Sequence, residues 1–320
     1  MDYSTKLKEY LDTQKEMTAN TKRSYISSFN SLQKLFKTDN IDYIKNSKET
    51  IKEIEEAYPK PNVISTKINT ILLLFKVFYT DSNKEYEKYK KEFLKYRKNI
   101  ITIIKEGYEA HEATETQKEK AITEEENDKI IQVLKDSIKH STKSSMDIIN
   151  IRNYLIYSFI NNLHTRGDFI TSKLVIFKAK FEYDSNYNYI VINKKDKTIK
   201  YVQNNYKTKK THGQKIHDMD NDLYKWFLKL YNAYRKLELE TDYAFYQDNM
   251  ITPMNPDNLR KIYSKLGNDI IGHKISLQVA RVQNASEDYD IIEAVKEKAE
   301  KQGHSIDTHY IYAKKDIIKK

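Results

Sequence analysis

The chain has 320 residues, of which 39% are hydrophobic and 32% charged, and it contains no cysteine. Disulfide bonds, thiolate metal sites and cysteine nucleophiles are therefore excluded. Its 56 Lys and Arg against 46 Asp and Glu give a net charge of +10. This charge favours a polyanionic partner such as nucleic acid, because lysines and arginines gain affinity when they displace counterions from phosphates. An AT-rich coding sequence is the alternative explanation for the many Lys, Asn, Ile and Tyr residues.

Membrane and secreted classes are disfavoured. The most apolar run, Ile71–Phe75, is too short to span a membrane. The first residues lack the apolar core of a signal peptide. We therefore expect an intracellular protein, in the cytoplasm or nucleus of a host cell or associated with a virion, without a membrane partner.

The first part of the chain predicts a small basic helical domain. With only 6 Gly and 4 Pro in the whole chain, little interrupts its helices. Tyr25, Phe29, Leu32 and Phe36 recur at helical spacing, and Thr21 is placed to cap the helix that carries them. The predicted helices cover about Thr18–Lys37, Ser47–Tyr58, Ser65–Tyr79 and Asn83–Ile104.

Helical periodicity is lost at Glu106–Lys120, which is polar and which we interpret as an interdomain linker. A helix restarts at Thr123, where Thr123 and Glu126 form a capping box. The predicted organisation is a helical domain at 1–105, a linker at 106–122 and a second domain at 123–320.

The second domain mixes helices with a few strands. A helix is predicted at Asp147–Leu163, and others at Asn221–Leu239 and after Asn255-Pro256, an N-cap followed by proline. Between them, Tyr187–Asn193 and Thr198–Gln203 read as a β-hairpin, with a third strand at Gln214–Asp218. The fold class is therefore mainly α with a small antiparallel β-sheet.

Several polar side chains of this domain are candidates for chemistry. Arg281 lies on a helix between apolar residues, and a half-buried Arg needs an anionic partner. His304 is followed eight residues later by Tyr312 near a basic C-terminus, an arrangement that suits attack of a phenol on a phosphate. The other candidates are Arg166, after the helix at Asp147–Leu163, and Lys207, in a basic loop.

Each of these candidates has a structural alternative. An Arg in a turn is commonly solvated, and a basic loop is commonly flexible. The chain has 26 Tyr, so a Tyr near a His is common by chance, and two aromatic residues can simply pack a terminal helix.

The order Arg, loop Lys, Arg, His and Tyr resembles the tyrosine recombinase, or phage integrase, family. The resemblance covers most of the chain. The helical domain with Thr21-x-x-x-Tyr25 is similar to that family's core-binding domain, and the region from Thr123 is similar to its catalytic domain. It implies a two-domain clamp around DNA. The motifs Arg166–Phe169, Asn205–Thr208 and Gly303–Ser305 look most like integrases of large DNA viruses, virophages and related transposons.

The resemblance assigns a role to each candidate. Arg166 and Arg281 hold the nonbridging oxygens of the scissile phosphate through charge-assisted hydrogen bonds. Tyr312 is the nucleophile that forms a 3′-phosphotyrosyl intermediate. Lys207 gives a proton to the leaving 5′ oxygen, and His304 hydrogen-bonds the phosphate.

Further residues support this set. Lys209 and Lys210 are alternatives to Lys207, and Asp168 is expected to orient Arg166 by a salt bridge. No metal or cofactor is required. The partner is double-stranded DNA, with a possible homo-tetramer on DNA and a monomer or dimer in solution. Expected DNA contacts are Thr21, Lys22, Arg23, Lys67 and Lys210.

The sequence also departs from the family. Gln278 stands where the family usually has His or Lys, so we expect slowed rather than abolished chemistry. The spacing from His304 to Tyr312 is one residue short, which leaves Tyr310 as an alternative nucleophile. Only eight residues follow Tyr312, which puts in doubt a tetramer built by exchange of C-terminal segments.

The expected function is site-specific recombination or integration of duplex DNA. A type IB topoisomerase-like enzyme would use the same residues to relax supercoils. A DNA-binding relative without catalysis is the third reading, and Gln278 is the feature that allows it.

Overall fold

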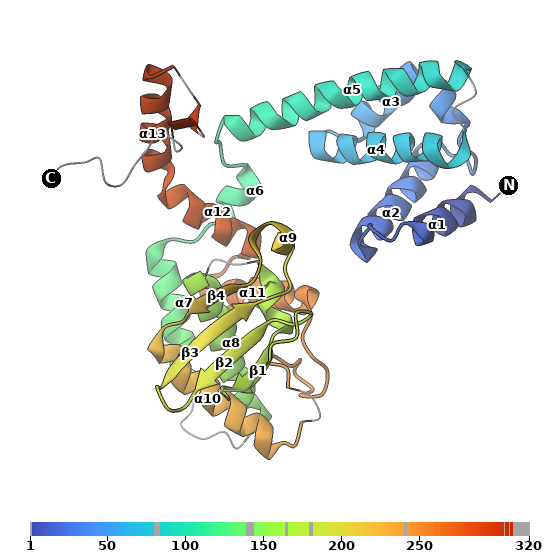
Figure 1. The fold of residues 1–320 in the computed structure, drawn as a ribbon. Coiled ribbons are helices and arrows are strands. Elements are labelled where there is room, and N and C mark those ends of the chain that lie inside the picture. The colour runs from blue at the N-terminus through green and yellow to red at the C-terminus, as the bar shows by residue number, and fades with distance from the viewer. Residues whose placement is uncertain are drawn as a thin grey trace. The chain divides into compact units, whose positions relative to one another are not determined.

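The computed structural model describes residues 2–79, 84–138, 144–163, 166–178, 182–239, 242–303, 305–306 and 308–309. The chain divides into two compact units, Met1–Ala113 and Thr114–Lys320, which are considered separately (Figure 1). The division falls inside the segment expected as a linker. That segment is partly helical, because α5 continues to Glu109 and a short helix, α6 (Glu115–Lys118), follows behind a Thr114–Gln117 capping box.

In its described residues the first unit is helical throughout. Its core is formed by apolar side chains that recur at helical spacing, such as Phe29 and Leu32, Ile68 and Ile71, and Phe93. Its elements are α1 (Tyr3–Thr13), α2 (Ala19–Leu35), the 3-10 helix η1 (Asp42–Lys45), α3 (Ser47–Ala57), α4 (Pro61–Phe78) and α5 (Lys84–Glu109).

Two details of this unit differ from the sequence-based expectation. The N-cap of α2 is Thr18, whose hydroxyl accepts a hydrogen bond from the Thr21 amide, so Thr21 lies inside the first turn. Helix α1 was not predicted, because only Leu7 and Leu11 are buried along it and two side chains give little periodicity. The helices at α2 to α5 are present near the expected positions.

The second unit combines helices with a small sheet. Its helices are α6, α7 (Glu124–Asp136), α8 (Ser145–Leu163), η2 (Gly167–Thr171), α9 (Lys209–His212), α10 (Asn221–Lys236), α11 (Pro256–Ile271), α12 (Leu277–Glu287) and α13 (Tyr289–Lys301). Its strands are β1 (Lys173–Ile176), β2 (Tyr189–Asn193), β3 (Thr198–Gln203) and β4 (Lys215–Asp218). The Thr123–Glu126 capping box of α7 and the Asn255 cap with Pro256 at the start of α11 are confirmed.

The sheet has the order β1-β2-β3-β4. The pairs β2–β3 and β3–β4 are antiparallel as expected, but β1 pairs with β2 in parallel, so the sheet is mixed. Strand β1 was not predicted, because its single buried residue, Leu174, gives no alternation over only four residues. The mainly helical fold class with a small sheet is otherwise confirmed.

Alternation along the strands separates two faces. Ile190, Ile192, Ile199 and Tyr201 belong to the main core, which α8 and α10 complete behind the sheet (Figure 1). The residues between them, including Val191 and Val202, form a smaller cluster on the opposite face. Within the described ranges, no helix is both long enough and apolar enough to cross a membrane.

Candidate functional site

Arg166 lies where the core helix α8 gives way to the turn η2. It is the extended residue that precedes the 3-10 helix, and its side chain is exposed. The next residue must be small, because a Cβ added to Gly167 would stand 2.7 Å from Cδ2 of Leu259 and 3.7 Å from Cδ1 of Leu277. The turn that carries Arg166 is therefore packed closely against α11 and the first residue of α12.

Arg281 lies on α12, one turn beyond Leu277 and on the same face, because residues four apart in a helix are stacked. The helix is capped by Ser276, whose hydroxyl accepts from the Val279 amide, and Val279 anchors it in the core. The Arg281 Nε is buried and has no hydrogen-bond partner in the described part of the chain. A buried guanidinium donor without an acceptor is ready to bind an anion.

The carboxyl of Asp168 is affected by the charges of both Arg166 and Arg281. Burial raises the pKa of the Asp168 carboxyl, whereas the positive charges of Arg166 and Arg281 oppose that rise and lower the pKa. Both guanidiniums therefore lie within electrostatic range of one carboxylate. No ion pair joins Asp168 to Arg166 among the described residues, so their interaction is longer-ranged than the expected salt bridge.

The loop between β3 and β4 carries the candidate lysines. Lys207 and Lys210 are exposed. The ammonium of Lys209 instead donates to the Ser185 carbonyl at 2.8 Å, which holds it against the neighbouring loop. Tyr206, whose hydroxyl donates to the Gly213 carbonyl at 2.7 Å, closes the base of the loop. Lys207 and Lys210 are thus more available to a ligand than Lys209.

The C-terminal candidates His304, Tyr310 and Tyr312 lie outside the described residues. Gln278, at the second position of α12, is exposed and lies one turn before Arg281. His273 has its Nε2 at 3.3 Å from Oε1 of Glu126, a residue of the α7 capping box. Its position there agrees with a structural role.

The candidates in the first unit lie near the start of α2. Thr21 and Arg23 are exposed, and Lys22 is half-buried with its ammonium 3.4 Å from the Asp12 carbonyl. Thr21 also lines a pocket of about 400 Å³ between α2 and α4, together with Asn20, Ser24, Tyr25, Thr66 and Asn69. Hydroxyl and amide groups of this kind are common contacts to nucleic-acid backbones.

Lys67 is placed differently from the expectation that it contacts DNA. Lys67 is only 7% exposed. Its ammonium donates to the Ser31 hydroxyl and lies 4.9 Å from the centre of the Tyr58 ring. Burial lowers the pKa of Lys67. This lysine packs the first unit, because its stem and its charge are both directed inward.

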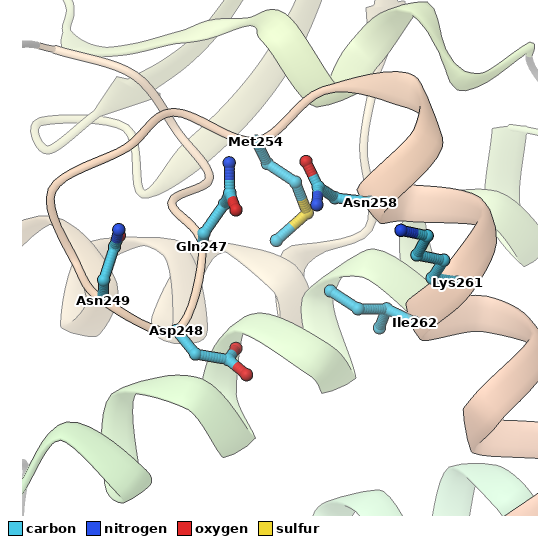
Figure 2. A pocket seen from close by; sticks show the side chains of 7 residues that line it. All are labelled: Gln247, Asp248, Asn249, Met254, Asn258, Lys261 and Ile262. Carbon is cyan, nitrogen blue, oxygen red and sulfur yellow. The ribbon is translucent and has the colours of Figure 1, made fainter.

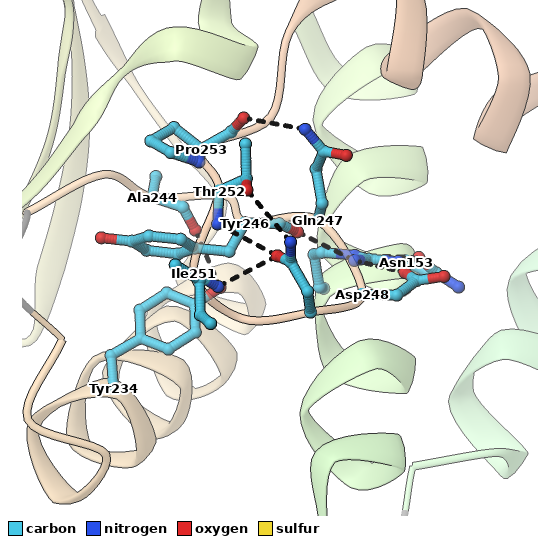
Figure 3. Close-up of polar contacts among 11 residues, drawn as sticks. Asn153, Tyr234, Ala244, Tyr246, Gln247, Asp248, Ile251, Thr252 and Pro253 are labelled. Atoms are coloured by element: carbon cyan, nitrogen blue, oxygen red, sulfur yellow. Dashed lines mark hydrogen bonds and ion pairs between the residues drawn. The ribbon is translucent and has the colours of Figure 1, made fainter.

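A separate pocket of about 240 Å³ opens beside the loop that precedes α11 (Figure 2). Several of its polar side chains already have partners. Gln247 donates to the Pro253 carbonyl (Figure 3). Asn249 accepts from the Ile251 and Thr252 amides, and Asn258 belongs to the cap of α11. This pocket is therefore part of the loop's own architecture. No group of three metal-ligating side chains is found among the described residues.

One feature of the site and one structural feature of the same unit had little or no signal in the sequence. Gly167 lies close to Leu259 and Leu277. The only hint of this contact in the sequence is the glycine next to Arg166. Arg152, at 1% exposure the most deeply buried cation described, had no sequence signal, because it occupies one position of an otherwise apolar helix.

No family model and no curated protein matches the chain. Among solved structures, XerA recombinase is similar at 12% identity and a TM-score of 0.34, over 88% of this chain and 81% of that one. XerH site-specific recombinase bound to difH substrate, in a pre-cleavage complex, is 12% identical with a TM-score of 0.42 over 98% and 91%. Its post-cleavage complex with palindromic difH has 12% identity and a TM-score of 0.40, over 97% and 90%. Likenesses this distant decide neither the fold nor the activity of this chain.

Proposed function

We propose that this chain is a tyrosine-recombinase-like enzyme that cleaves and rejoins duplex DNA. The observation that carries the proposal is that Gly167, beside Arg166, packs against Leu277, one helical turn before Arg281, so that two arginines from separate elements lie within electrostatic range of the Asp168 carboxyl. The buried Nε of Arg281, which has no partner in the described residues, supports the presence of an anion-binding position at the same place. From its sequence motifs, we further propose that the chain is related to integrases of large DNA viruses, virophages and related transposons.

The proposed chemistry is transesterification at one phosphate. The Tyr312 phenol loses its proton to solvent, and its oxygen forms a bond to phosphorus. The bond from phosphorus to the 5′ oxygen breaks, and Lys207 gives that oxygen a proton. The transition state has additional negative charge on the nonbridging oxygens, and two fixed guanidiniums stabilise that charge more than they stabilise the ground state. Reversal of the same steps rejoins the strand.

Asp168 has a positioning role in this proposal. Its carboxyl lies within electrostatic range of both arginines, and we propose that its charge holds theirs near the site before DNA binds. His304 contributes a further hydrogen bond to the phosphate. Gln278 keeps the capacity to hydrogen-bond but supplies neither a proton nor a charge.

DNA binding is distributed more widely than the chemistry. The net charge of +10 supports binding of a polyanion. In the first unit, Thr21, Lys22 and Arg23 at the start of α2 are proposed to contact the DNA backbone, and Lys210 does so in the second. Lys67 is left out because it is buried.

A suicide duplex nicked close to the cleavage position tests the proposal. The wild type is expected to accumulate a covalent protein–DNA adduct, because the short cleaved strand diffuses away before rejoining. Mass spectrometry of the adduct identifies the modified residue. Tyr312→Phe should abolish the adduct and Tyr310→Phe should leave it intact, so the two substitutions are matched controls for each other.

The outcomes also separate the alternative readings. Absence of an adduct with the wild type would leave only a DNA-binding protein. Rapid relaxation of supercoiled plasmid without joining of two DNA sites would indicate a topoisomerase. A modified Tyr310 would change the nucleophile but preserve the reaction class.

A further inference from the structure

Asn188 is a buried amide that lies between the candidate catalytic segments. It immediately precedes β2 and is only 2% exposed. Its Nδ2 donates to the Asp168 carbonyl at 3.2 Å and to the Asn205 carbonyl at 3.0 Å. Its Oδ1 accepts from the Asn204 amide at 2.9 Å and from the Asn205 amide at 2.7 Å. The amide therefore uses both of its N–H groups and two acceptor positions.

These partners belong to different parts of the site. Asp168 lies in η2, two residues after Arg166, and its own amide donates to the Arg166 carbonyl at 2.7 Å. Asn204 and Asn205 are the first residues after β3 and begin the loop that carries Lys207. One side chain thus joins the turn that carries the first arginine to the loop that carries the lysine.

The sheet explains why the junction is here. Strands β1 and β2 are parallel and begin together, with Lys173 opposite Tyr189, whereas β3 is antiparallel and ends opposite the start of β2. The backbone ladder therefore ends at this edge, where the Asn188 carbonyl still accepts from the Lys173 amide at 2.8 Å. The Asn188 side chain continues the hydrogen bonding where the ladder ends.

Hydrogen bonds of Asn204 and Asn205 also hold the base of the loop that carries Lys207. Asn204, which is 2% exposed, accepts from Nε2 of Gln214 at 2.6 Å, and this links the two ends of the loop. Nδ2 of Asn205 donates to the Asn186 carbonyl at 3.0 Å. The loop therefore leaves the sheet from a fixed base, and the exposed part with Lys207 begins only beyond it.

The chemistry of the partners requires an amide. Two carbonyl oxygens face one end of the Asn188 side chain and two backbone N–H groups face the other, so the partners themselves decide which atom is nitrogen. An aspartate of the same shape would place a carboxylate oxygen against two carbonyl oxygens. A leucine would leave two backbone N–H groups, of which that of Asn204 is buried, and two backbone carbonyls without this partner.

We propose that Asn188 is a positioning residue that fixes the loop of Lys207 relative to the turn of Arg166. A catalytic role for this restraint rests on the proposed function. The coupling between the two segments can be tested without catalysis. A proton donor and a phosphate clamp must be held in a set geometry, and a misplacement of about 1 Å can reduce rate roughly 100-fold. Asn188 supplies that restraint from the edge of the rigid sheet.

The first test is hydrogen–deuterium exchange of the full-length protein. Asn188→Leu is expected to accelerate exchange roughly 10- to 100-fold in both the 166–172 and the 204–208 segments. Exchange in α8 and α10 should remain unchanged. Asn150→Leu is the matched control, because it removes a half-buried amide that donates to the Ser137 carbonyl at 2.9 Å, away from both segments.

The second test is the rate of adduct formation on the nicked duplex. Asn188→Leu should reduce the single-turnover rate roughly 10- to 100-fold with a DNA dissociation constant within about threefold of wild type. Asn188→Asp keeps the two acceptor contacts and loses both donors. Its activity should rise as the pH falls, because a protonated carboxyl regains one donor, and the wild type should not show this gain.

Each outcome decides the proposal. Faster exchange in only one of the two segments, or a rate in Asn188→Leu equal to that in Asn150→Leu, would overturn it. If neither Asn188 variant folds, Asn188 is a general folding residue and the proposal is rejected. If the wild type forms no adduct, the proposed function fails, while the exchange data still decide whether Asn188 couples the segments.

Discussion

Two arginines of the second unit, the buried Arg152 and the half-buried Arg281, differ in what their guanidiniums touch. Arg152, on α8, donates from Nε and Nη2 to Oδ1 of Asn153 at 3.2 and 2.9 Å, and from Nη1 to the Tyr246 carbonyl at 2.8 Å. Nη1 also lies 2.8 Å from a carboxylate oxygen of Asp248 (Figure 3). Arg281, on α12, has a buried Nε without a partner in the described residues.

The difference separates a structural arginine from one available to a ligand. Arg152 ties α8 to the loop that holds Asp248, and its hydrogen bonds are internal to the protein. Arg281 keeps a desolvated donor without an acceptor, which is costly unless an anion arrives. Lys67 in the first unit belongs with Arg152, because its ammonium is buried and already donates to Ser31.

The largest expected effect is on catalysis by Arg281. Arg281→Ala should reduce the single-turnover rate of adduct formation about 100- to 1000-fold, because a fixed donor to the transition-state oxygens is lost. DNA affinity should change little, since many other cations share the binding. The measurement compares rates and dissociation constants on the nicked duplex.

Arg260→Ala is the control for that substitution. Arg260 is exposed and pairs with Asp257 three residues before it, so the variant removes an arginine charge without touching the site. Its rate should be close to wild type. Parallel losses of rate and affinity in Arg281→Ala would show that Arg281, too, is a structural arginine.

The second effect is on stability and concerns Arg152. Arg152→Leu should lower the free energy of unfolding by about 2–4 kcal/mol, because the buried Tyr246 carbonyl loses its cationic donor. Urea unfolding followed by tryptophan fluorescence reports this unit alone, since the single Trp of the chain, Trp226, lies on α10. Arg281→Leu should cost less than about 1 kcal/mol by the same measurement. A reversed order of the two costs would break the distinction between the arginines.

A smaller effect is expected from the pH dependence of Asp168. Because burial raises the pKa of this carboxyl in the folded state, the folded protein binds a proton more readily than the unfolded chain. Asp168 therefore contributes stability when protonated, and this contribution is lost as the pH rises through its folded-state pKa. Relative to Asp168→Asn, the wild type should gain stability as the pH falls through that pKa towards the ordinary pKa of an aspartate. A constant difference between the two proteins across this range would argue that the carboxyl is not desolvated.

The smallest effects concern the first unit. Arg23→Met should reduce the slope of log affinity against log salt by about 1, as expected for one lost phosphate contact. Lys67→Met should leave that slope unchanged, because its charge is directed inward. DNA binding measured between low and moderate salt tests both variants, and a reduced slope for Lys67→Met would return this lysine to the DNA surface.

Local features of the fold were predictable because they depend on neighbouring residues. Thr123 with Glu126 and Asn255 with Pro256 mark helix starts through bonds within one turn. The strands at β2 and β3 follow from alternation of β-branched and aromatic residues. Strand β1 was not predictable, because its pairing with β2 depends on a connection through the rest of the fold.

The sequence by itself determined the classes of side chain in this protein: a basic chain without cysteine, mainly helical, with Arg166, Lys207 and Arg281 in a recognisable order. Tertiary structure alone decided which basic side chains have partners for their donors, as Arg152 and Lys67 do, and which have a buried donor without a partner in the described part of the chain, as Arg281 does. It also placed Asn188 between two segments that are far apart in the chain. The physical reason is that hydrogen-bond partners and desolvation depend on distant segments that meet only in the folded state, whereas periodicity and capping are properties of a few adjacent residues.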